Sequence, residues 1–554
     1  MSGRIAFAPY RIPPGALAAE AARLAADAAG EPLLARIEDP LPAALLPGAF
    51  AEIPAGLAGA PEEACRGADG SPAGAPGAPR ACLNSPRHRA RVEAGVRRAL
   101  ELGYAGVCLD LPDAPLALGI LGAGFCADCQ RAFARELVRE YGDHFQPLDY
   151  LALAREALAS APGALSHERI AFGREFWRAR ATWLDAAVAA YARTARDAAR
   201  EAGRPLEVAA RFEAIGPAQL HSARHLDAAV FPVAGAPQSS GAGLFRLLRA
   251  VLGRRPCAAE LTPDSPADRL AAVAATSGVE VILPGSPGLA PALASVRRFA
   301  RAAAARGRSA ARSEPVAECA ILYSSESDLW TGGDHRSQVE LAGDALAALQ
   351  VQAPVVLRPA DAPPGAVLVL AGAGALSPLE AQEVRRRLEA GGGVLCLGDP
   401  AAVDGGGRPA PAPLPAGKPS GFRVGKGTLV ELPPVEPARG GGVPDPHGLE
   451  LLARGLHVLL GRGLRAVSTA GRMPLLVALH RSDGRLDAHL VALGAGPARG
   501  STLFLGLQVA GDARRGRFKS TDGVDERVPL NPSGYAVSTV LPSFEGYAVL
   551  SLPG

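Results

Sequence analysis

Two neighbouring stretches of this 554-residue chain carry residue types that could do chemistry. The segment Gly106-Val-Cys-Leu-Asp-Leu-Pro-Asp113 has the apolar character of a short strand that delivers carboxylates to its end. Carboxylates held in this way can act as proton donors or acceptors. A short way on, Gly124-Phe-Cys-Ala-Asp-Cys129 contains two cysteines with the spacing of half a metal site. The first stretch therefore suggests acid–base chemistry and the second a metal.

Further charged residues follow other apolar runs. Glu260 ends the run Pro256-Cys-Ala-Ala-Glu260, and Glu213 comes just after an apolar run at 206–210 with Arg211 beside it. Glu213 is a further candidate acid, and Arg211 could bind a hydroxyl or a carboxylate. The structural alternatives are a solvated carboxylate for Glu260, a loop cap for Asp110, and rim positions for Arg211 and Glu213.

Elements that could position these groups alternate through residues 1–312. The chain is 48% apolar, enough for a sizeable core, and its length suggests two to four domains. Short apolar strands separated by helical patterns predict a parallel (β/α)8 TIM-type barrel, whose site lies at the carboxyl ends of the strands. Candidate strands are Ile5–Ala8, Leu33–Ile37, Gly106–Leu109, Leu206–Ala210, Ala228–Phe231, Cys257–Glu260 and Val279–Leu283. These are seven strands, so either an eighth is hidden in 40–80 or the barrel is truncated at its start.

Helical patterns in this half recur with four-residue spacing. Residues 87–101 form one, for which Ser85-Pro86 supplies an N-cap and a first-turn proline. A second follows Cys129, and a long one covers roughly 169–202.

The strand pattern restarts at Val316. Alternating strands and helices over 313–420 predict a compact flavodoxin- or amidotransferase-like α/β domain, closed by a Pro/Gly-rich stretch at 401–420. Residues 421–554 contain a helix at about 447–462 and then a series of strand-like runs, which predict a small β-sandwich.

Charge and hydropathy exclude several kinds of partner. The net charge is +3, which gives no electrostatic case for nucleic acid or an anionic membrane. No stretch approaches 18 uninterrupted apolar residues, and the first residues lack the pattern of a signal peptide. A cytoplasmic protein is expected, with its eight cysteines as core thiols or metal ligands instead of disulfides.

Several of these motifs together resemble glycoside hydrolase family 42, the β-galactosidases. The resemblance rests on Cys82-Leu-Asn-Ser-Pro86, on the strand 106–110, on Phe125-Cys-Ala-Asp-Cys129 and on the strand 256–260, which occur in the family's order. Those proteins carry a Cys-Pro-Asn-Ser-Pro turn, a strand that ends in Asp-Asn-Glu, and a Cys-x-Cys-x-x-Cys cluster that leads into a helix. The segment Val316-Ala-Glu-Cys-Ala-Ile-Leu-Tyr323 resembles their trimerisation domain, so a homotrimer is implied.

The resemblance implies roles for the carboxylates. Glu260 matches the nucleophile of a retaining glycosidase, which works with a second carboxyl group roughly 5–5.5 Å away. Asp110 matches the family's Asp, but Pro112 stands where the family has its acid/base Glu, and proline transfers no proton. Asp110 or Asp113 could substitute as the acid. Because Asp is shorter than Glu, the separation could also open toward the roughly 6.5–9.5 Å that suits inversion.

The cysteines depart from the family in a similar way. Four thiolates hold a structural zinc in the resembling proteins, and Cys82, Cys126 and Cys129 match three of them, with Gly124 at the fourth position. Asp128 or His88 could complete the tetrahedron. The alternative is three reduced thiols in a relic loop. No cofactor is expected to take part in the chemistry itself.

Two functions follow as expectations. The first is a glycosidase that hydrolyses a β-linked, galactoside-like O-glycosyl bond with Glu260 as nucleophile and Asp110 or Asp113 as acid. The second is a degenerate barrel that binds a small carbohydrate, or acts as a scaffold, without hydrolysis. Aromatic residues are only 5% of the chain, which provides few platforms for sugar rings.

Overall fold

The structure is a computed structural model, and it describes most of the chain in two compact units. One unit comprises 1–232 and 282–286, and the other comprises 233–281 and 287–554. The described residues are 34–36, 49–111, 122–142, 149–160, 173–212, 214–233, 240–261, 267–282, 299, 302–331, 333–398, 403–404, 422–438, 444–460, 465–494 and 496–553. The expected strand Ile5–Ala8 lies outside them.

A parallel sheet forms the centre of the first unit. Its strands, in spatial order, are β1 (Leu34–Arg36), β2 (Phe50–Ile53), β5 (Gly106–Leu111), β6 (Glu207–Phe212) and β7 (Ala228–Val233). Strand β2 lies within 40–80, so the expectation of a hidden strand there is confirmed. All of β5 is buried, as expected for a parallel strand that is covered on both faces.

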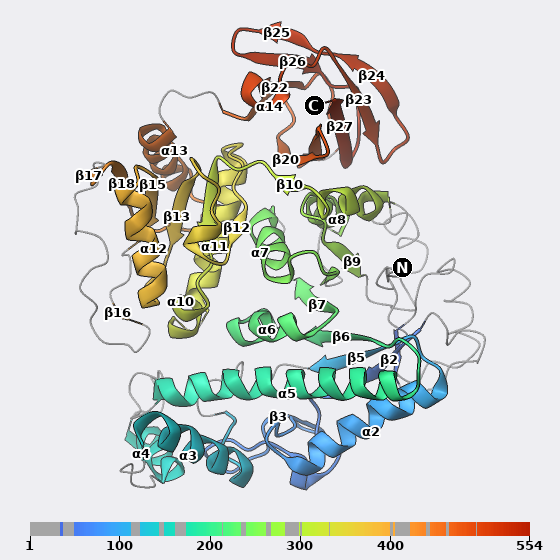
Figure 1. Cartoon of the computed structure of the whole chain (residues 1–554), viewed down its shortest axis with the longest axis vertical. Coiled ribbons are helices and arrows are strands. Elements are labelled where there is room, and N and C mark those ends of the chain that lie inside the picture. Colours follow the sequence, from blue (N-terminus) through green and yellow to red (C-terminus); the bar gives the residue numbers. More distant parts are fainter. Residues whose placement is uncertain are drawn as a thin grey trace. The chain divides into compact units, whose positions relative to one another are not determined.

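Four longer helices belong to this unit; three of them lie where the apolar periodicity predicts a helix, and the first packs on β2 and β5. They are α2 (Pro86–Leu102), α3 (Ala127–Tyr141), α4 (Tyr150–Ser160) and α5 (Gly173–Glu201). Ser85 caps α2 as predicted, because its hydroxyl accepts a hydrogen bond from the His88 amide. Figure 1 shows the long helix α5 running beside α2 and α3. Short helices α6 (Pro217–Ser222) and η4 (Ala223–His225) connect β6 to β7.

The second unit opens with further strand–helix pairs. These are α7 (Ala242–Leu252), β8 (Cys257–Leu261), α8 (Ala267–Thr276) and β9 (Glu280–Ile282). Strands β8 and β9 fall where the sequence predicts them, and they are neighbours in one sheet. With the five strands of the first unit, the described residues supply seven strands of this type.

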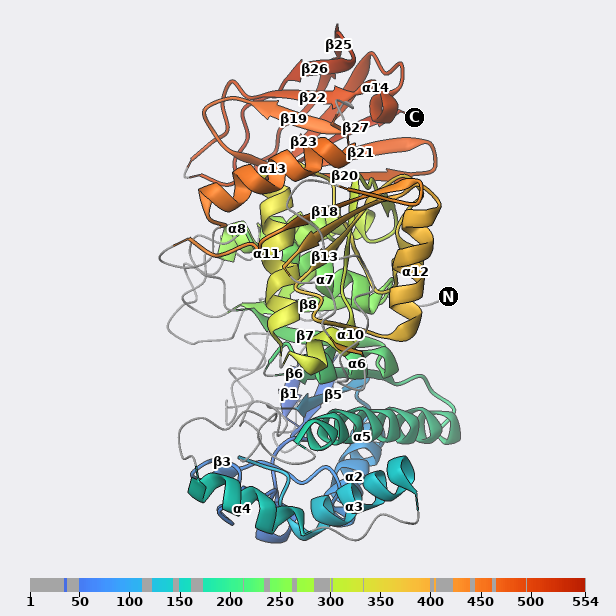
Figure 2. The same ribbon diagram turned by 90° about the vertical axis from the view of Figure 1, so that its left-hand side faces the viewer.

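A second sheet follows in the same unit, in the order β12-β11-β13-β15-β18-β17, and it is parallel except for the antiparallel pair β17 and β18. Figure 2 shows α11 (Asp334–Ala348) and α12 (Pro378–Glu389) on opposite faces of this sheet, as in a doubly wound fold. The strands are β11 (Cys319–Leu322), β12 (Val355–Val356), β13 (Val367–Ala371), β15 (Gly393–Leu397), β17 (Phe422–Val424) and β18 (Gly427–Leu432). Because β17 and β18 belong to it, the sheet continues past position 420, where the sequence predicts a domain boundary. Helix α13 (Pro446–Leu460) packs on β15 and β18.

Two further sheets of the second unit are antiparallel. One has the order β10-β20-β21-β27-β23-β24 and the other β19-β22-β26-β25. Phe518 of the first and Leu505 of the second belong to one buried apolar cluster, so the sheets share a core, as in a β-sandwich. The strands are β10 (Glu314–Pro315), β19 (Val467–Ala470), β20 (Leu475–Ser482), β21 (Arg485–Ala492), β22 (Thr502–Gly506), β23 (Arg515–Ser520), β24 (Asp525–Pro529), β25 (Asn531–Ser533), β26 (Ala536–Val540) and β27 (Tyr547–Pro553).

Candidate functional site

Asp110 and Arg211 are brought together at the carboxyl ends of β5 and β6. They are partners in the strand register, and the Arg211 guanidinium donates to Asp110 Oδ1 at 3.0 Å. Their side chains are 6% and 16% exposed, so this ion pair lies largely out of water. Burial strengthens the attraction between the two charges but makes loss of either partner costly. Asp110 is therefore a structured part of the sheet end and not a freely moving surface acid.

Glu52 is a buried acid of the same sheet that the sequence reading missed. It lies on β2 opposite Cys108 in register and is 2% exposed. Side chains alternate along a strand, so Cys108 and Asp110 face the same side of the sheet, and Glu52 faces it too. Phe50, Cys108 and Ala209 form an apolar layer on this face, which confirms Cys108 as a core thiol. In the sequence, Glu52 could have been recognised as the one carboxylate within the apolar run 49–53.

Glu260 is the last but one residue of β8, in the second unit. Every residue of β8 is buried, and Glu260 is 9% exposed. Its position at the carboxyl end of a parallel strand is the place where α/β folds build their sites. A solvated carboxylate, the structural alternative for this residue, does not agree with that burial.

Three positions of the sequence argument cannot be placed in the site. Asp113 and Glu213 lie outside the described residues, and so does Pro112. Of the expected carboxylate groups, the structure therefore describes Asp110 in one unit and Glu260 in the other.

A cluster of four cysteines lies in the first unit. The Cys82 sulfur is 3.2 Å from that of Cys126 and 3.5 Å from that of Cys129, and the sulfurs of Cys65, Cys126 and Cys129 all lie within 4.8 Å of one another. Four sulfurs around one zinc ion at about 2.3 Å would be about 3.8 Å apart. Four thiols are the donor set of a closed tetrahedral zinc site, and the sulfurs of Cys65, Cys126 and Cys129 lie near enough together to share one ion.

Cys65 is the member of this cluster that the sequence reading missed. It precedes the turn at Asp69-Gly70 and is fully buried. Gly124, which occupies the position where the family has its fourth cysteine, donates its backbone amide to the Cys65 sulfur at 3.1 Å. Asn84 Nδ2 lies 3.5 Å from the Cys129 sulfur as a second donor. Such donors orient and stabilise thiolate ligands.

Hydrogen bonds among the four cysteines shift the pKa values of their thiols in opposite directions. Those from Cys129, Cys65 and Cys82 lower the pKa of Cys126 strongly. The interaction with Cys126 in turn raises the pKa of both Cys82 and Cys129. The pKa of Cys65 is lowered too, since the opposing effect of Cys126 is outweighed by hydrogen bonds from Cys129 and Cys82. The protein alone thus favours thiolates at Cys126 and Cys65, and a bound dication would supply the charge that lets the other two ionise.

The two side chains expected to complete the metal site have other partners. The His88 ring is fully buried and donates from Nε2 to the Ala55 carbonyl at 2.8 Å, and burial lowers its pKa to about 4. Asp128 accepts a hydrogen bond from Arg131 one turn along α3. The side chain that joins the three predicted cysteines in the structure is Cys65, and not either of these two residues.

Gly124 gives a test of the cluster's packing. Its φ is +95°, and a Cβ atom there would lie 2.7 Å from Phe176 Cζ. We expect Gly124→Ala to lower the free energy of unfolding by roughly 2–4 kcal/mol, since strain and overpacking add. The matched control is Gly142→Ala, at φ +80° with nothing within 4 Å, which should cost about 1 kcal/mol. Equal values in denaturant unfolding would contradict this account.

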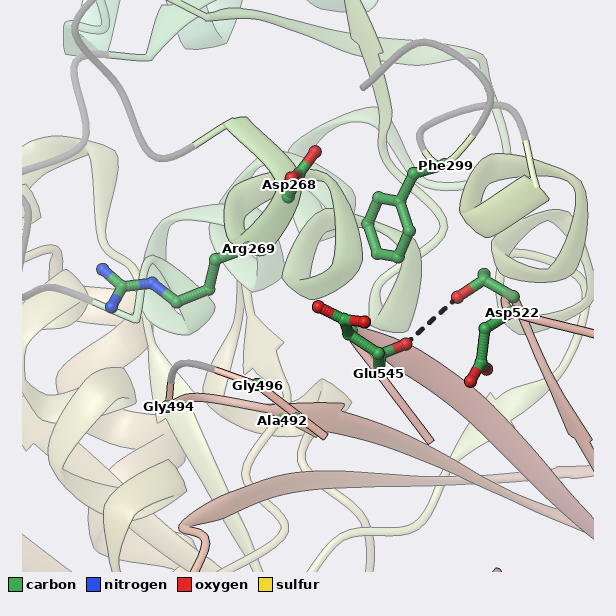
Figure 3. A pocket seen from close by; sticks show the side chains of 10 residues that line it. Asp268, Arg269, Phe299, Ala492, Gly494, Gly496, Asp522 and Glu545 are labelled. Carbon is green, nitrogen blue, oxygen red and sulfur yellow. Dashed lines mark hydrogen bonds between the residues drawn. The ribbon is translucent and has the colours of Figure 1, made fainter. Parts of the chain in front are cut away.

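One cavity of the second unit, of about 540 Å³, has none of these residues in its lining. Figure 3 shows Phe299, Asp268 and Glu545 around it, with Gly494 and Gly496 along one side. The Thr521 hydroxyl donates to the Glu545 carbonyl at 3.3 Å, the bond drawn dashed in that view. Asp268 and Glu545 are exposed, and among the described residues that line the cavity no charged side chain is buried, unlike in most catalytic sites.

Comparison with solved structures identifies the fold. A β-galactosidase from Bacillus circulans sp. alkalophilus matches with a TM-score of 0.64 at 12% identity, over 98% of this chain and 92% of that one. A glycoside hydrolase family 42 β-galactosidase from G. stearothermophilus matches with a TM-score of 0.62 at 13% identity, over 91% and 88%. An α-L-fucosidase isoenzyme from Paenibacillus thiaminolyticus matches with a TM-score of 0.58 at 14% identity, over 91% and 87%.

The class that these matches define is the glycoside hydrolase fold of the family 42 β-galactosidases. This chain resembles those proteins over nearly its whole length and is a divergent example of the fold. No protein-family model matches the sequence, and no curated protein is significantly similar to it. In the part of the chain that the structure describes, no helix is long and apolar enough to cross a membrane.

Proposed function

We propose that the chain is a glycosidase that hydrolyses a β-linked, galactoside-like O-glycosyl bond with carboxylate chemistry. Glu260 would act as the nucleophile, and Asp110 or Asp113 would protonate the leaving oxygen. In this scheme Glu260 attacks the anomeric carbon, the aglycone leaves as an alcohol, and water then releases the sugar.

The observation that carries the proposal is the burial of Glu260 at the carboxyl end of β8. Burying a carboxylate costs free energy unless hydrogen bonds or opposite charges compensate it, so a buried acid must be held by its surroundings. In a chain with this fold, an acid held at that strand end supports a catalytic role. The fold does not fix the sugar, since the matching structures include an α-L-fucosidase as well as β-galactosidases.

A second candidate function is carbohydrate binding without hydrolysis. Two observations favour it: proline occupies the family's acid/base position at 112, and Asp110 already accepts a hydrogen bond from Arg211. In this reading Arg211 and Asp110 would bind sugar hydroxyls, a task that suits a fixed pair of opposite charges.

We also propose a structural zinc ion held by Cys65, Cys82, Cys126 and Cys129. The metal would fix the loop between β2 and α2 against α3 and would take no part in the chemical step. A homotrimer built through the α/β domain, and a cytoplasmic location, remain proposals that follow from the family resemblance and from the sequence.

The two functions are distinguished by a panel of aryl glycosides. The glycosidase proposal expects turnover of at least one aryl β-glycoside by the wild-type protein, with aryl α-glycosides as the negative arm. Binding of the free sugar, measured by calorimetry, without turnover of any member would instead support the second function. A folded protein that neither binds nor hydrolyses any member would contradict both.

Two asparagine variants assign the acid. If Asp113 protonates the leaving group, Asp113→Asn should lower kcat/KM by about 10²–10⁴-fold for glycosides with poor leaving groups and far less for activated aryl glycosides. If Asp110 does so, Asp110→Asn shows that selective loss. An equal loss on both kinds of substrate would mean that the residue positions the substrate instead of transferring a proton.

A further inference from the structure

A second cavity of the second unit, of about 280 Å³, is lined by cationic side chains. It lies at the carboxyl ends of α7 and α8, with walls from the start of β12 and from β20. Arg246 and Arg249 are one turn apart on α7, so they share one face of that helix, and Arg254 follows just beyond its end. Residues 253–254 precede β8, whereas Glu260 is near the far end of that strand, so this cavity is separate from Glu260.

Backbone carbonyls hold the two inner guanidinium groups without neutralising them. Arg246 donates to the Ala353 carbonyl at 3.2 Å, and Arg249 donates to those of Gly278 and Arg255 at 3.3 and 2.5 Å. The Arg249 Nε atom is buried and has no partner. Throughout the described ranges, no carboxylate oxygen comes within 4.0 Å of Arg246, Arg249 or Arg254. The two inner guanidinium groups therefore have N–H donors and positive charge available for an anionic ligand.

Burial makes these charges unfavourable. It lowers the pKa of Arg246 to about 10 although the nearby Asp344 opposes the shift, and it lowers the pKa of Arg249 although Cys257 and Glu280 oppose it. His480 adds no charge to the wall, because burial lowers its pKa to about 4. The one carboxylate of the lining is Glu314, which is exposed and so is screened by water.

A small hydroxyl group completes the lining. Ser277 follows the last turn of α8 and is 8% exposed, and its hydroxyl has no hydrogen-bond partner within the described part of the chain. Guanidinium groups donate in pairs to tetrahedral and planar oxyanions, and a hydroxyl can donate to a third oxygen. The apolar walls, which include Val355 and Leu479, leave room for more than a bare ion.

We propose that this cavity binds the phosphate group of a small molecule, with Arg246 and Arg249 as the main ligands and Arg254 at the entrance. The chemistry is shared by inorganic phosphate and by a phosphorylated sugar, which would place its ring against the apolar wall. This site is independent of the proposed glycosidase function.

The test measures binding to the full chain by calorimetry at constant ionic strength, kept constant with chloride. Inorganic phosphate is expected to bind with a Kd below about 1 mM, and galactose 1-phosphate to bind more tightly than phosphate if the wall takes the sugar. Equal affinities would assign the site to the free ion. No heat from either probe up to about 10 mM would overturn the proposal.

Variants identify the ligands. Arg246→Gln should weaken phosphate binding by at least about tenfold, and Glu314→Gln should strengthen it modestly, because it removes the one negative charge of the lining. Arg254 is exposed, so Arg254→Gln should leave the fold intact and test the site even if Arg246→Gln fails to fold. It should weaken phosphate binding by about threefold. The control is Arg454→Gln, an exposed arginine of α13 that pairs with Glu450. Unchanged affinity in folded Arg246→Gln and Arg254→Gln would refute the assignment.

Discussion

Glu260→Gln is expected to lower kcat for the best aryl β-glycoside by about 10³-fold or more, with the fold unchanged. The amide keeps the shape of the side chain but is a very poor nucleophile, so the covalent glycosyl-enzyme cannot form. Since Glu260 is buried in a strand, the isosteric change avoids the cavity that a shorter side chain would leave.

The control for this variant is Glu280→Gln. Glu280 is the first residue of β9, the strand beside β8, so it lies at the amino end of its strand. Its carboxylate lies 3.6 Å from the Arg308 guanidinium. Its loss should change kcat by less than about threefold, because it is remote from the carboxyl end where Glu260 lies. Comparable losses in both variants would show that Glu260 acts through stability and not through chemistry.

Azide separates a nucleophile from a residue that only orients the substrate. In Glu260→Ala, the space left by the side chain admits azide, which can attack the anomeric carbon of an activated glycoside. The expected product is a glycosyl azide of inverted configuration, detectable by NMR. Recovery of hydrolysis without a glycosyl azide would instead assign Glu260 a positioning or base role.

Cys65→Ser is the second change with a large expected effect. It removes a fully buried sulfur of the four-cysteine cluster, so the zinc content of the purified protein should fall from about one ion per chain to nearly none. The free energy of unfolding should fall by more than about 3 kcal/mol, since binding of a structural metal is coupled to folding.

The matched control is Cys108→Ser, which changes another fully buried thiol of the same unit. Cys108 belongs to the apolar layer of the sheet and not to the cluster, so the zinc content should stay unchanged while stability falls only modestly. Elemental analysis and thermal unfolding measure both variants. Wild-type protein that carries no zinc when prepared without chelators would refute the metal site.

Much of the fold could be predicted from the sequence because the periodic segments are long and buried. The predicted strands 106–109 and 257–260 begin at the same residues as β5 and β8, since each is an apolar run that follows turn residues. Strand β2 escaped detection because it is only four residues long and contains Glu52. A short apolar run that contains a carboxylate has the pattern of a loop, and only its pairing with a neighbouring strand identifies it as a strand.

The site was less predictable for a different physical reason. Cys65 is 17 positions before Cys82, and only the folding of the loop at 54–85 brings the two thiols to one place. The Asp110–Arg211 pair also depends on strand register, which no local pattern reveals. Spacing finds ligands that share one turn or one helix, as Cys126 and Cys129 do, whereas the remaining ligands come from tertiary structure.

The pairing of β10 with β20 has a consequence for how this chain can be divided. Residues 314–315 form β10, the first strand of the antiparallel sheet that contains β20. The chain then builds the whole α/β sheet and returns to the antiparallel sheet only at residue 475. The α/β sheet is thus an insertion between two strands of the antiparallel sheet, and not an independent domain that follows another in sequence. A recombinant fragment that stops near 460 would strip β10 of its partner, so the part to express for this region begins before residue 314 and includes the last strand.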